Sequence, residues 1–353
     1  MRSISFNYIG LFLLAMFCGL HFMTYASEYT QEHELKEKYH NEIATFWQTG
    51  TFGNIEGVNK TKLAYASFIN ASNNKCLVIV PGRTEGYLKY KELSFDLFQQ
   101  GYDIHIIDHR GQGISQRMQE NPYKGYVEVF DFYSDDLHTF IEQVVNPQCK
   151  DQYLLAHSMG GAIAGRYLQR FPNNIKAAVL ASPMIAINSG PMPEWLAKSV
   201  VSIGDTLSQW LSDDSWYFLG QGDYEKSDFE DNRLTQSKLR YQLFNQEYQN
   251  QPNLQLGGVT YRWIAEALVA NEALFEDIEK LSTPTIVLQA GGDVVVDNQA
   301  QNDFCAALHL AHSASCPNGR PLHIADSEHE LFFEIDSIRN AAIDAALSWF
   351  KRH

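Results

Sequence analysis

The sequence has 353 residues, of which 45% are hydrophobic and 13% aromatic, and it carries a formal net charge of −15. This length and apolar content are sufficient for a full hydrophobic core and exclude a disordered chain. The negative charge argues against a nucleic-acid partner, because phosphates require a basic surface, and against simple electrostatic adhesion to anionic membranes.

The first 26 residues differ in character from the rest of the chain. Arg2 supplies one positive charge, an apolar run extends from Ile9 to about Met23, and the segment ends at Ala26. This pattern predicts a secretory signal peptide over residues 1–26, and therefore a periplasmic or secreted protein. An uncleaved membrane anchor, or association with the inner membrane, is the alternative, because bulky residues make the cleavage region irregular.

Apolar runs bounded by turn signals recur along the mature chain and predict buried β-strands. An alternating segment at 63–69 is expected to form an outer strand. Further runs, separated mostly by helical patterns, lie at 76–82, 102–111, 153–158, 177–183, 284–293 and, less apolar, 321–330. Buried strands that alternate with helices predict an α/β fold with a mostly parallel central sheet and helices on both faces.

The alternation stops between Pro183 and Leu281. The residues there are rich in aromatic and polar side chains and show helical patterns without a strand. We interpret residues 187–282 as a helical cap inserted into the α/β core, whose two parts are then residues 27–186 and 283–353.

One serine lies where a strand turns into a helix, in the stretch YLLAHSMGGAIAGRYL at 153–168. Ser158 has small residues two positions before and after it, Ala156 and Gly160, which allow a sharp turn. Such a turn exposes the hydroxyl as a nucleophile. The alternative is an ordinary helix cap. The strand–turn–helix context favours the nucleophile.

A serine nucleophile requires a base, and the base requires an orienting acid. Asp293 and His329 each follow a predicted strand, where sites in such sheets are built. We therefore expect His329 to accept the Ser158 proton and Asp293 to hold the imidazole in the productive tautomer. Asp297 is the rival acid, but it lies further from the end of the strand. His157 is expected to pack beneath the turn.

A tetrahedral intermediate also requires two amide donors. Met159 follows the nucleophile and is expected to give one backbone N–H. Arg83 follows Gly82 in the stretch PGRTEGY and is expected to give the other, a task that does not need its guanidinium. The stretch DHRGQG at 108–113 is expected to form a tight turn beneath the rim of the site and not a phosphate-binding loop.

With these motifs the chain resembles the bacterial lysophospholipase branch of the monoacylglycerol lipase-like α/β-hydrolases. The resemblance covers most of residues 60–350, and it implies an α/β-hydrolase fold with the triad and oxyanion amides at the residues named above. Two positions depart from the family pattern: Pro81 stands where many relatives have histidine, and Ala156 replaces glycine. The segments that carry the resemblance are VIVPGRTEGYLKY, GYDIHIIDHRGQGIS, LLAHSMGGAIA, NLQLGGVTYRW, LQAGGDVVVDN and SEHELFFE.

The resemblance implies a serine esterase that hydrolyses the acyl ester of a lysophospholipid or monoacylglycerol through an acyl-enzyme. Hydrolysis of another small ester or amide is the alternative, because this fold hosts many reactions. An inactive lipid-binding homologue is a third possibility, against which the complete triad argues. No metal or organic cofactor is implied, and a lipid substrate is compatible with transient contact with a membrane surface. Head group, acyl length and oligomeric state stay open.

Four cysteines remain after residues 1–26, an even number that permits two disulfides in an exported chain. Cys76 opens the first core strand and Cys149 precedes the strand that leads to the nucleophile. Since these strands are parallel neighbours in this fold, the two cysteines are expected to pair. Four buried thiols in a cytosolic protein are the alternative.

Cys305 and Cys316 are expected to form the second disulfide. Together with His309 and His312 they have the residue types of a zinc site, but one continuous helix would spread the four residues over about 16 Å. Either a zinc site or a disulfide therefore requires the chain to reverse before Cys316. The export signal favours the disulfide.

The cap aromatics bear on the substrate, because acyl-ester pockets are concave and mostly apolar. About half of them are expected to pack in the cap core and the rest to line a groove to Ser158, a groove that suits one acyl chain better than two. Arg83, Lys89 and Lys91 offer positive charge near a phosphodiester, although simple solvation is the alternative for the lysines. The aromatic residues are Trp195, Trp210, Trp216, Phe218, Tyr241, Phe244, Tyr261 and Trp263.

Overall fold

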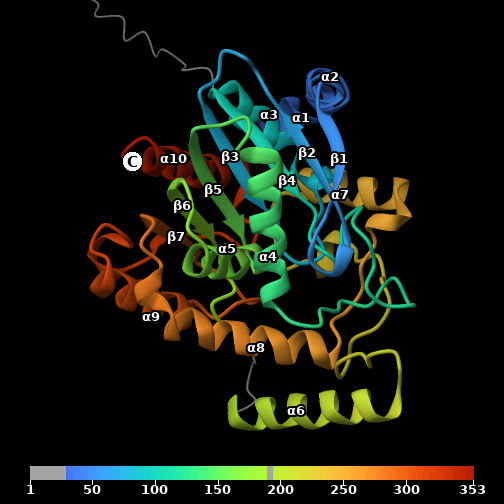
Figure 1. The fold of residues 1–353 in the computed structure, drawn as a ribbon. Helices are drawn as coiled ribbons and strands as arrows, with labels where there is room; N and C mark the ends of the chain where they lie inside the picture. Colours follow the sequence, from blue (N-terminus) through green and yellow to red (C-terminus); the bar gives the residue numbers. More distant parts are fainter. Residues whose placement is uncertain (1–28, 189–193) are drawn as a thin grey trace, which may run out of the picture.

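The centre of the molecule is a twisted eight-stranded sheet (Figure 1), described here in a computed structural model that covers residues 29–188 and 194–353. The strand order is β1-β2-β4-β3-β5-β6-β7-β8. β1 and β2 are antiparallel to their neighbours, and the remaining strands pair in parallel. The strands are β1 (Thr51–Glu56), β2 (Lys62–Phe68), β3 (Lys75–Val80), β4 (Tyr102–Ile107), β5 (Asp151–His157), β6 (Ile175–Ala181), β7 (Thr285–Ala290) and β8 (Leu322–Ile324).

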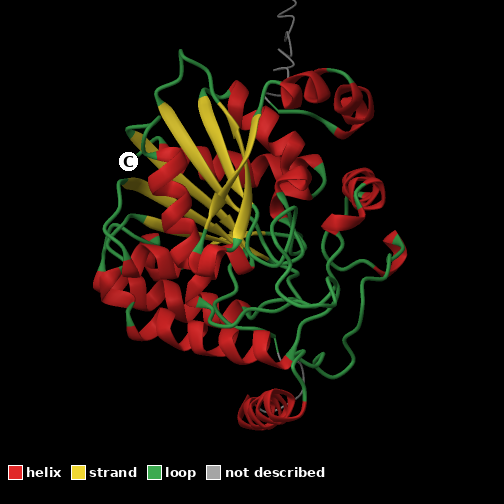
Figure 2. Ribbon diagram, turned by 45° about the vertical axis from the view of Figure 1, so that its right-hand side comes forward, coloured by secondary structure: helices red, strands yellow, loops and turns green. Residues whose placement is uncertain are grey.

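Helices cover both faces of this sheet (Figure 2). On one face, α4, α5, α8 and α9 contribute to a core that contains Phe140, Ile163 and Leu274. On the other, α2, α3 and α10 surround a second core with Phe46 and Phe350. The helices are α1 (Glu32–His40), α2 (Glu42–Gln48), α3 (Lys91–Gln99), α4 (Asp131–Phe140), α5 (Met159–Arg170), α6 (Glu194–Leu211), α7 (Lys238–Asn250), α8 (Tyr261–Glu276), α9 (Asn298–Ala311) and α10 (Asp336–Phe350).

Each strand expected from the sequence is present, and the structure adds the edge strand β1. Its sequence, TFGNIE, has no apolar run, and its side chains are exposed or only half-buried. Pairing with β2, from Thr51 opposite Ser67 to Glu56 opposite Lys62, holds it in place. An edge strand of this kind has no hydrophobic pattern from which it could be predicted.

The segment between β6 and β7 contains three long helices and, in its described part, no strand. α8 packs against α5, and its residues Ala267 and Leu274 belong to the main core. α7 contacts α1, where Leu243 packs on Leu35 and Ile43. α6 lies along the outer side of α8, away from the sheet (Figure 1).

A disulfide joins Cys76 to Cys149, with the two Cα atoms 6.0 Å apart, which confirms the first predicted pair. The parallel register of β3 and β5 sets Cys76 opposite Gln152, so the starts of these strands lie side by side. The predicted signal peptide lies outside the described residues. None of the helices in residues 29–188 and 194–353 is long and apolar enough to cross a membrane.

The second predicted disulfide is absent from the structure, where Cys305 and Cys316 are free, buried thiols. The chain does reverse before Cys316, and the Cys316 thiol donates a hydrogen bond to Cys305 Sγ at 2.7 Å, but no disulfide joins them. Buried among core side chains, the thiols pack as small apolar groups. His309 and His312 bind the backbone carbonyls of other residues. Across the described residues, no group of three or more His, Cys, Asp or Glu could hold a metal ion.

Candidate active site

Ser158 occupies the sharp turn between β5 and α5. Its φ of 54° and ψ of −121° lie in a region that residues other than glycine rarely adopt. The turn is tight because a Cβ on Gly160 would lie 2.2 Å from the carbonyl oxygen of Val80. Ala156, two residues before the serine, is fully buried in β5 opposite Val80, a position that accepts a methyl group. The turn thus has the geometry that the sequence predicts.

Three side chains meet at this turn in one hydrogen-bonded chain. His329 Nε2 lies 2.8 Å from Ser158 Oγ, and His329 Nδ1 lies 2.7 Å from Asp293 Oδ2. Asp293 follows β7 and His329 follows β8, so all three residues come from the carboxyl ends of parallel strands. The structure therefore brings together the serine, histidine and acid that the sequence singles out.

The carboxylate of Asp293 is held in its ionised form. Burial favours the neutral acid, but the hydrogen bond and charge of His329 outweigh burial, and the backbone N–H groups of Val295 and Val296 donate to Oδ1. The pKa of Asp293 is accordingly lowered. The rival acid, Asp297, accepts the N–H groups of Gln299 and Ala300 as the N-cap of α9.

The loop after β3 lies directly beside Ser158. A Cβ on Gly82 would stand 3.1 Å from Ser158 Cβ, a crowded contact that glycine avoids. The backbone N–H groups of Arg83 and Met159 have no hydrogen-bond partner within residues 29–188 and 194–353. Two unengaged amides next to a serine hydroxyl can stabilise a developing oxyanion.

A buried carboxylate, Glu85, fixes this loop, and sequence analysis did not identify it. Its Oε2 accepts the N–H of Gly82 at 2.5 Å and the hydroxyl of Tyr90 at 2.5 Å. Its Oε1 accepts from Lys89 Nζ at 2.7 Å, and Lys89 also donates to Glu330 at 2.6 Å. Glu330 follows His329 directly, so one cluster of charges connects the loop that carries Gly82 and Arg83 to the loop that carries His329.

His157 also belongs to this charged cluster and does more than pack. Its Nδ1 lies 3.2 Å from Glu85 Oε1, a charge contact without the alignment of a hydrogen bond, and its ring lies 5.0 Å from that of His329. Burial alone would favour the neutral imidazole. The charge of Glu85 overrides burial and raises the pKa of His157.

The two lysines are neither solvated nor available to a phosphodiester. Lys89 is buried between Glu85 and Glu330, and Lys91 pairs with Glu247 at 2.6 Å. Both positive charges are thus neutralised by carboxylates from the same protein. Carboxylates far away in the sequence, at 247 and 330, provide this pairing, which the local pattern did not indicate.

The DHRGQG segment forms the expected turn beneath the rim of the site. Gln112 Nε2 donates to the carbonyl oxygens of Gly82 and Glu85, at 2.6 and 2.9 Å. His109 Nε2 lies 3.1 Å from the carbonyl oxygen of Pro81. The turn therefore supports the loop of the oxyanion amides from below.

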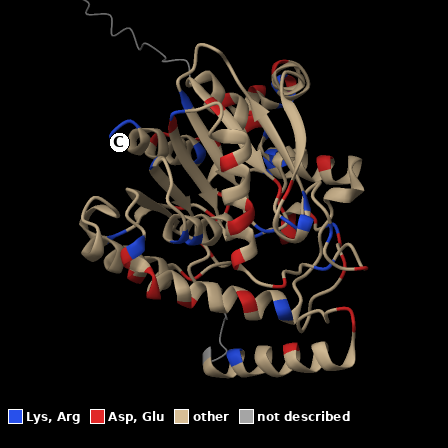
Figure 3. Cartoon of the chain, in the orientation of Figure 1, with Lys and Arg blue, Asp and Glu red and all other residues tan. Residues whose placement is uncertain are grey.

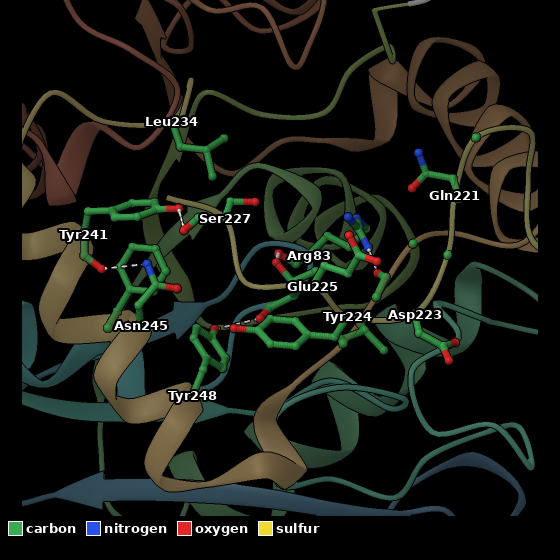
Figure 4. Close-up of a pocket in the computed structure, with 17 residues that line it drawn as sticks. Arg83, Gln221, Asp223, Tyr224, Glu225, Ser227, Leu234, Tyr241, Asn245 and Tyr248 are labelled. Atoms are coloured by element: carbon green, nitrogen blue, oxygen red, sulfur yellow. Dashed lines mark hydrogen bonds between the residues drawn. The ribbon is translucent and has the colours of Figure 1, made fainter. Parts of the chain in front are cut away.

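A cavity of about 630 Å³ opens beside this loop (Figure 4). Arg83 lines it, together with Tyr241 and Phe244 of α7, whereas Ser158 is not among its lining residues. Tyr224 and Tyr248 line it as well, although the sequence analysis did not single them out. The other aromatic residues that it did single out are not among the lining residues: Tyr261 and Trp263 are buried, and Trp195 and Trp210 are exposed on α6. Because Ser158 does not line this cavity, the cavity does not test the prediction that about half of those aromatics line a groove to Ser158, which stays a prediction.

Comparison with known proteins agrees with this geometry. The family described as "Serine aminopeptidase, S33" matches residues 71–336. Lysophospholipase L2 of Escherichia coli K12 is 37% identical over 312 residues, which cover 88% of this chain and 90% of that protein. The probable lysophospholipase L2 of Haemophilus influenzae is 35% identical over 302 residues, 84% of this chain and 91% of that protein. The chain belongs to this family of serine hydrolases.

A solved structure supports the α/β-hydrolase fold of the family. A soluble variant of monoglyceride lipase from Saccharomyces cerevisiae, in complex with a substrate analogue, superimposes with a TM-score of 0.65 at 18% identity. The match covers 86% of this chain and 94% of the yeast chain. The predicted fold class is thereby confirmed.

Replacing Glu85 with glutamine tests the charged cluster. The pKa of Glu85 is held well below its ordinary value because the charges of Lys89 and His157 outweigh burial. Breaking such a buried pair is expected to lower the free energy of unfolding by about 3–5 kcal/mol at pH 7. A carboxylate with a lowered pKa stabilises the fold above its unfolded pKa of about 4.3 and loses that effect as pH falls.

The measurement is urea unfolding of wild type and Glu85→Gln at pH 7, 5.5 and 4. The difference should be larger at pH 5.5 than at pH 7, because loss of Glu85 also removes the charge that raises the pKa of His157. It should begin to shrink below about pH 4.3, as the carboxylate of the unfolded wild type is protonated. Glu56→Gln, on the exposed edge of β1, is the control and should change stability by less than about 0.5 kcal/mol. A Glu85 variant as stable as this control would contradict the role of the cluster.

Proposed function

We propose that the protein is a serine esterase that hydrolyses the acyl ester of single-chain glycerolipids, namely lysophospholipids and monoacylglycerols. The observation that carries this proposal is the hydrogen-bonded chain from Ser158 through His329 to Asp293 beside two free amides. The 37% identity to lysophospholipase L2 over most of both chains supports the substrate class.

In the proposed reaction, Ser158 Oγ attacks the ester carbonyl carbon while His329 Nε2 takes its proton. Asp293 accepts the Nδ1–H of the resulting imidazolium and stabilises its charge. The oxyanion binds the N–H groups of Arg83 and Met159. His329 then gives the proton to the departing glycerol oxygen, which leaves an acyl-enzyme. Water, activated by the same histidine, releases the fatty acid and restores the serine.

Hydrolysis of another small ester or amide is the second candidate, because the family description names an aminopeptidase. An inactive lipid-binding homologue is a third candidate. The intact hydrogen bonds among the three side chains argue against it, since a binding protein has no need to align a base with a hydroxyl.

We further propose that the protein is exported, with residues 1–26 as its signal peptide. The disulfide between Cys76 and Cys149 supports export, because such bonds persist in oxidising compartments and are rare in the cytosol. Anchoring by the same segment, or association with the inner membrane, is the alternative.

We also propose transient contact with a lipid surface through α6. This helix carries few charged residues (Figure 3) and lies on the outside of the molecule. Exposed apolar and tryptophan side chains along one helix are typical of segments that lie in the membrane interface. Those exposed on α6 are Trp195, Leu196, Ile203, Leu207, Trp210 and Leu211.

The substrate class is tested by rates on lysophosphatidylcholine, monoolein and diacyl phosphatidylcholine in the same detergent. We expect the two single-chain lipids to be hydrolysed and the diacyl lipid to be turned over far more slowly. Ser158→Ala should lower kcat by about 10⁴-fold or more while the protein stays folded. A preference for the diacyl lipid, or an active Ser158→Ala variant, would refute the proposal.

The identity of the acid is tested by comparing two asparagine variants. Asp293→Asn removes the charge that orients His329 and should reduce kcat by roughly 10³-fold or more. Asp297→Asn, the matched control, changes only the N-cap of α9, which asparagine fills about as well as aspartate, so stability and activity should both be largely retained. Steady-state rates on a water-soluble ester decide between them, and the opposite order would reassign the acid.

The membrane contact is tested by sedimentation with phosphatidylcholine vesicles, whose neutral surface leaves only apolar attraction. The double variant Trp195→Ser, Trp210→Ser should weaken vesicle binding by about tenfold or more. Each tryptophan that becomes buried in the lipid interface contributes favourably to the free energy of binding. Leu310→Ser, at an exposed leucine of α9, is the control and should bind as the wild type does. Equal binding by all three proteins would show that α6 does not mediate the membrane contact.

A further inference from the structure

The cavity beside Arg83 is more polar than a site for an acyl chain would be. Asp223, Glu225, Ser227 and Asn245 line it together with backbone groups of the glycine-containing segments at 220–222 and 257–258. Acyl-chain sites are predominantly apolar. A cavity of about 630 Å³ with this lining suits the polar part of a substrate.

Arg83 brings an uncompensated positive charge to this cavity (Figure 4). Its Nη1 donates to the carbonyl oxygen of Gly257 at 2.9 Å, but it forms no ion pair with any carboxylate of the described residues. Burial lowers the pKa of this guanidinium to about 10, which still leaves it charged at neutral pH. Arg83 is half-buried, and a partly desolvated charge without an opposite charge is costly, a cost that an anionic ligand would reduce.

A second, independent observation also indicates a ligand. The hydroxyl oxygen of Tyr224, which lines the same cavity, is buried and has no hydrogen-bond partner in the described part of the chain. Buried polar groups in native structures are nearly always bonded. The lining of the cavity therefore combines a guanidinium that no carboxylate of the described residues pairs with and a hydroxyl that no described group binds.

The cavity also offers groups that attract a cation. Tyr241 and Tyr248 donate their hydroxyls to the carbonyl oxygens of Ser227 and Thr84, so their remaining surface toward a ligand is aromatic. Aromatic faces bind quaternary and primary ammonium groups. The carboxylate of Glu225 forms no ion pair within residues 29–188 and 194–353, and it is not paired with Arg83.

We propose that this cavity binds the zwitterionic head group of a lysophospholipid, with the phosphodiester on Arg83 and Tyr224 and the ammonium group among Tyr241, Tyr248 and Glu225. This inference rests on the proposed function and assigns its head-group specificity to residues outside the triad.

The position of Arg83 links this head-group site to the reacting ester. Its backbone N–H is one of the two proposed oxyanion donors, and the loop that carries it touches Ser158. The number of covalent bonds between this nitrogen and the guanidinium carbon is the same as the number between the ester carbonyl carbon and the phosphorus of a lysophospholipid. One residue can therefore hold the ester with its backbone and the phosphate with its side chain.

The phosphate contact is tested with Arg83→Met, which keeps the backbone N–H and the length of the side chain. We measure kcat/KM on lysophosphatidylcholine and on a monoacylglycerol with the same acyl chain. The ratio of the two values should fall by at least about tenfold, because a charged hydrogen bond is lost only with the phospholipid. Arg320→Met, at an exposed arginine, is the matched control and should leave the ratio unchanged.

The ammonium contact is tested with Glu225→Gln on lysophosphatidylcholine and lysophosphatidylglycerol, which share the phosphodiester but differ in the amine. The variant should lose activity on the choline lipid relative to the glycerol lipid. A second measurement uses the wild type and so does not depend on the folding of a variant. Glycerophosphocholine should inhibit hydrolysis of lysophosphatidylcholine more strongly than inorganic phosphate does at equal concentration. Equal inhibition would indicate an anion site only and overturn the proposal.

Two further outcomes separate this inference from the proposed function. If wild type hydrolyses both lipids and Arg83→Met lowers both rates equally, the head-group site is refuted and the esterase stands. If wild type hydrolyses neither lipid, both proposals fail.

Discussion

The whole site depends on how closely α5 approaches the end of β3. Gly160, in the first turn of α5, lies against the carbonyl oxygens of Val80 and Pro81, where no Cβ has room. This contact forces Ser158 into its positive-φ conformation and sets its hydroxyl toward His329. It also places the Gly82 loop against the nucleophile. Pairing of β5 with parallel strands on both sides fixes the end of the strand, which helps to hold Ser158 in this strained conformation.

A buried cluster of charges then fixes the two loops that must cooperate. Glu85 accepts the N–H of Gly82, and Lys89 joins Glu85 to Glu330, which follows the histidine in the chain. Burying such charges is expensive, and apolar replacements are often as stable. The benefit here is positional, because a hydrogen-bonded carboxylate holds a backbone amide more exactly in place than apolar packing does.

The local sequence pattern was sufficient to predict the elements with a strong hydrophobic signal and the candidate site residues at strand ends. The buried strands, the turn at Ser158 and the positions of Asp293 and His329 all follow from it. The sequence could not reveal β1, whose exposed face has no apolar pattern, or the partners of Lys89, which depend on a contact with Glu330 across the fold. The pairing at Cys76 followed from neighbouring parallel strands. At Cys305 no strand pairing was available, and the structure keeps the two thiols free.

The central claim is that one serine among many is activated by its surroundings. Treatment of the folded protein with a fluorophosphonate probe, followed by peptide mapping, tests this most directly, because the probe reacts with serines that a base has activated. We predict a single labelled peptide that carries the adduct on Ser158. Protein that is denatured before the probe is added should not be labelled. A folded protein that stays unlabelled, or an adduct on a different serine, would contradict it.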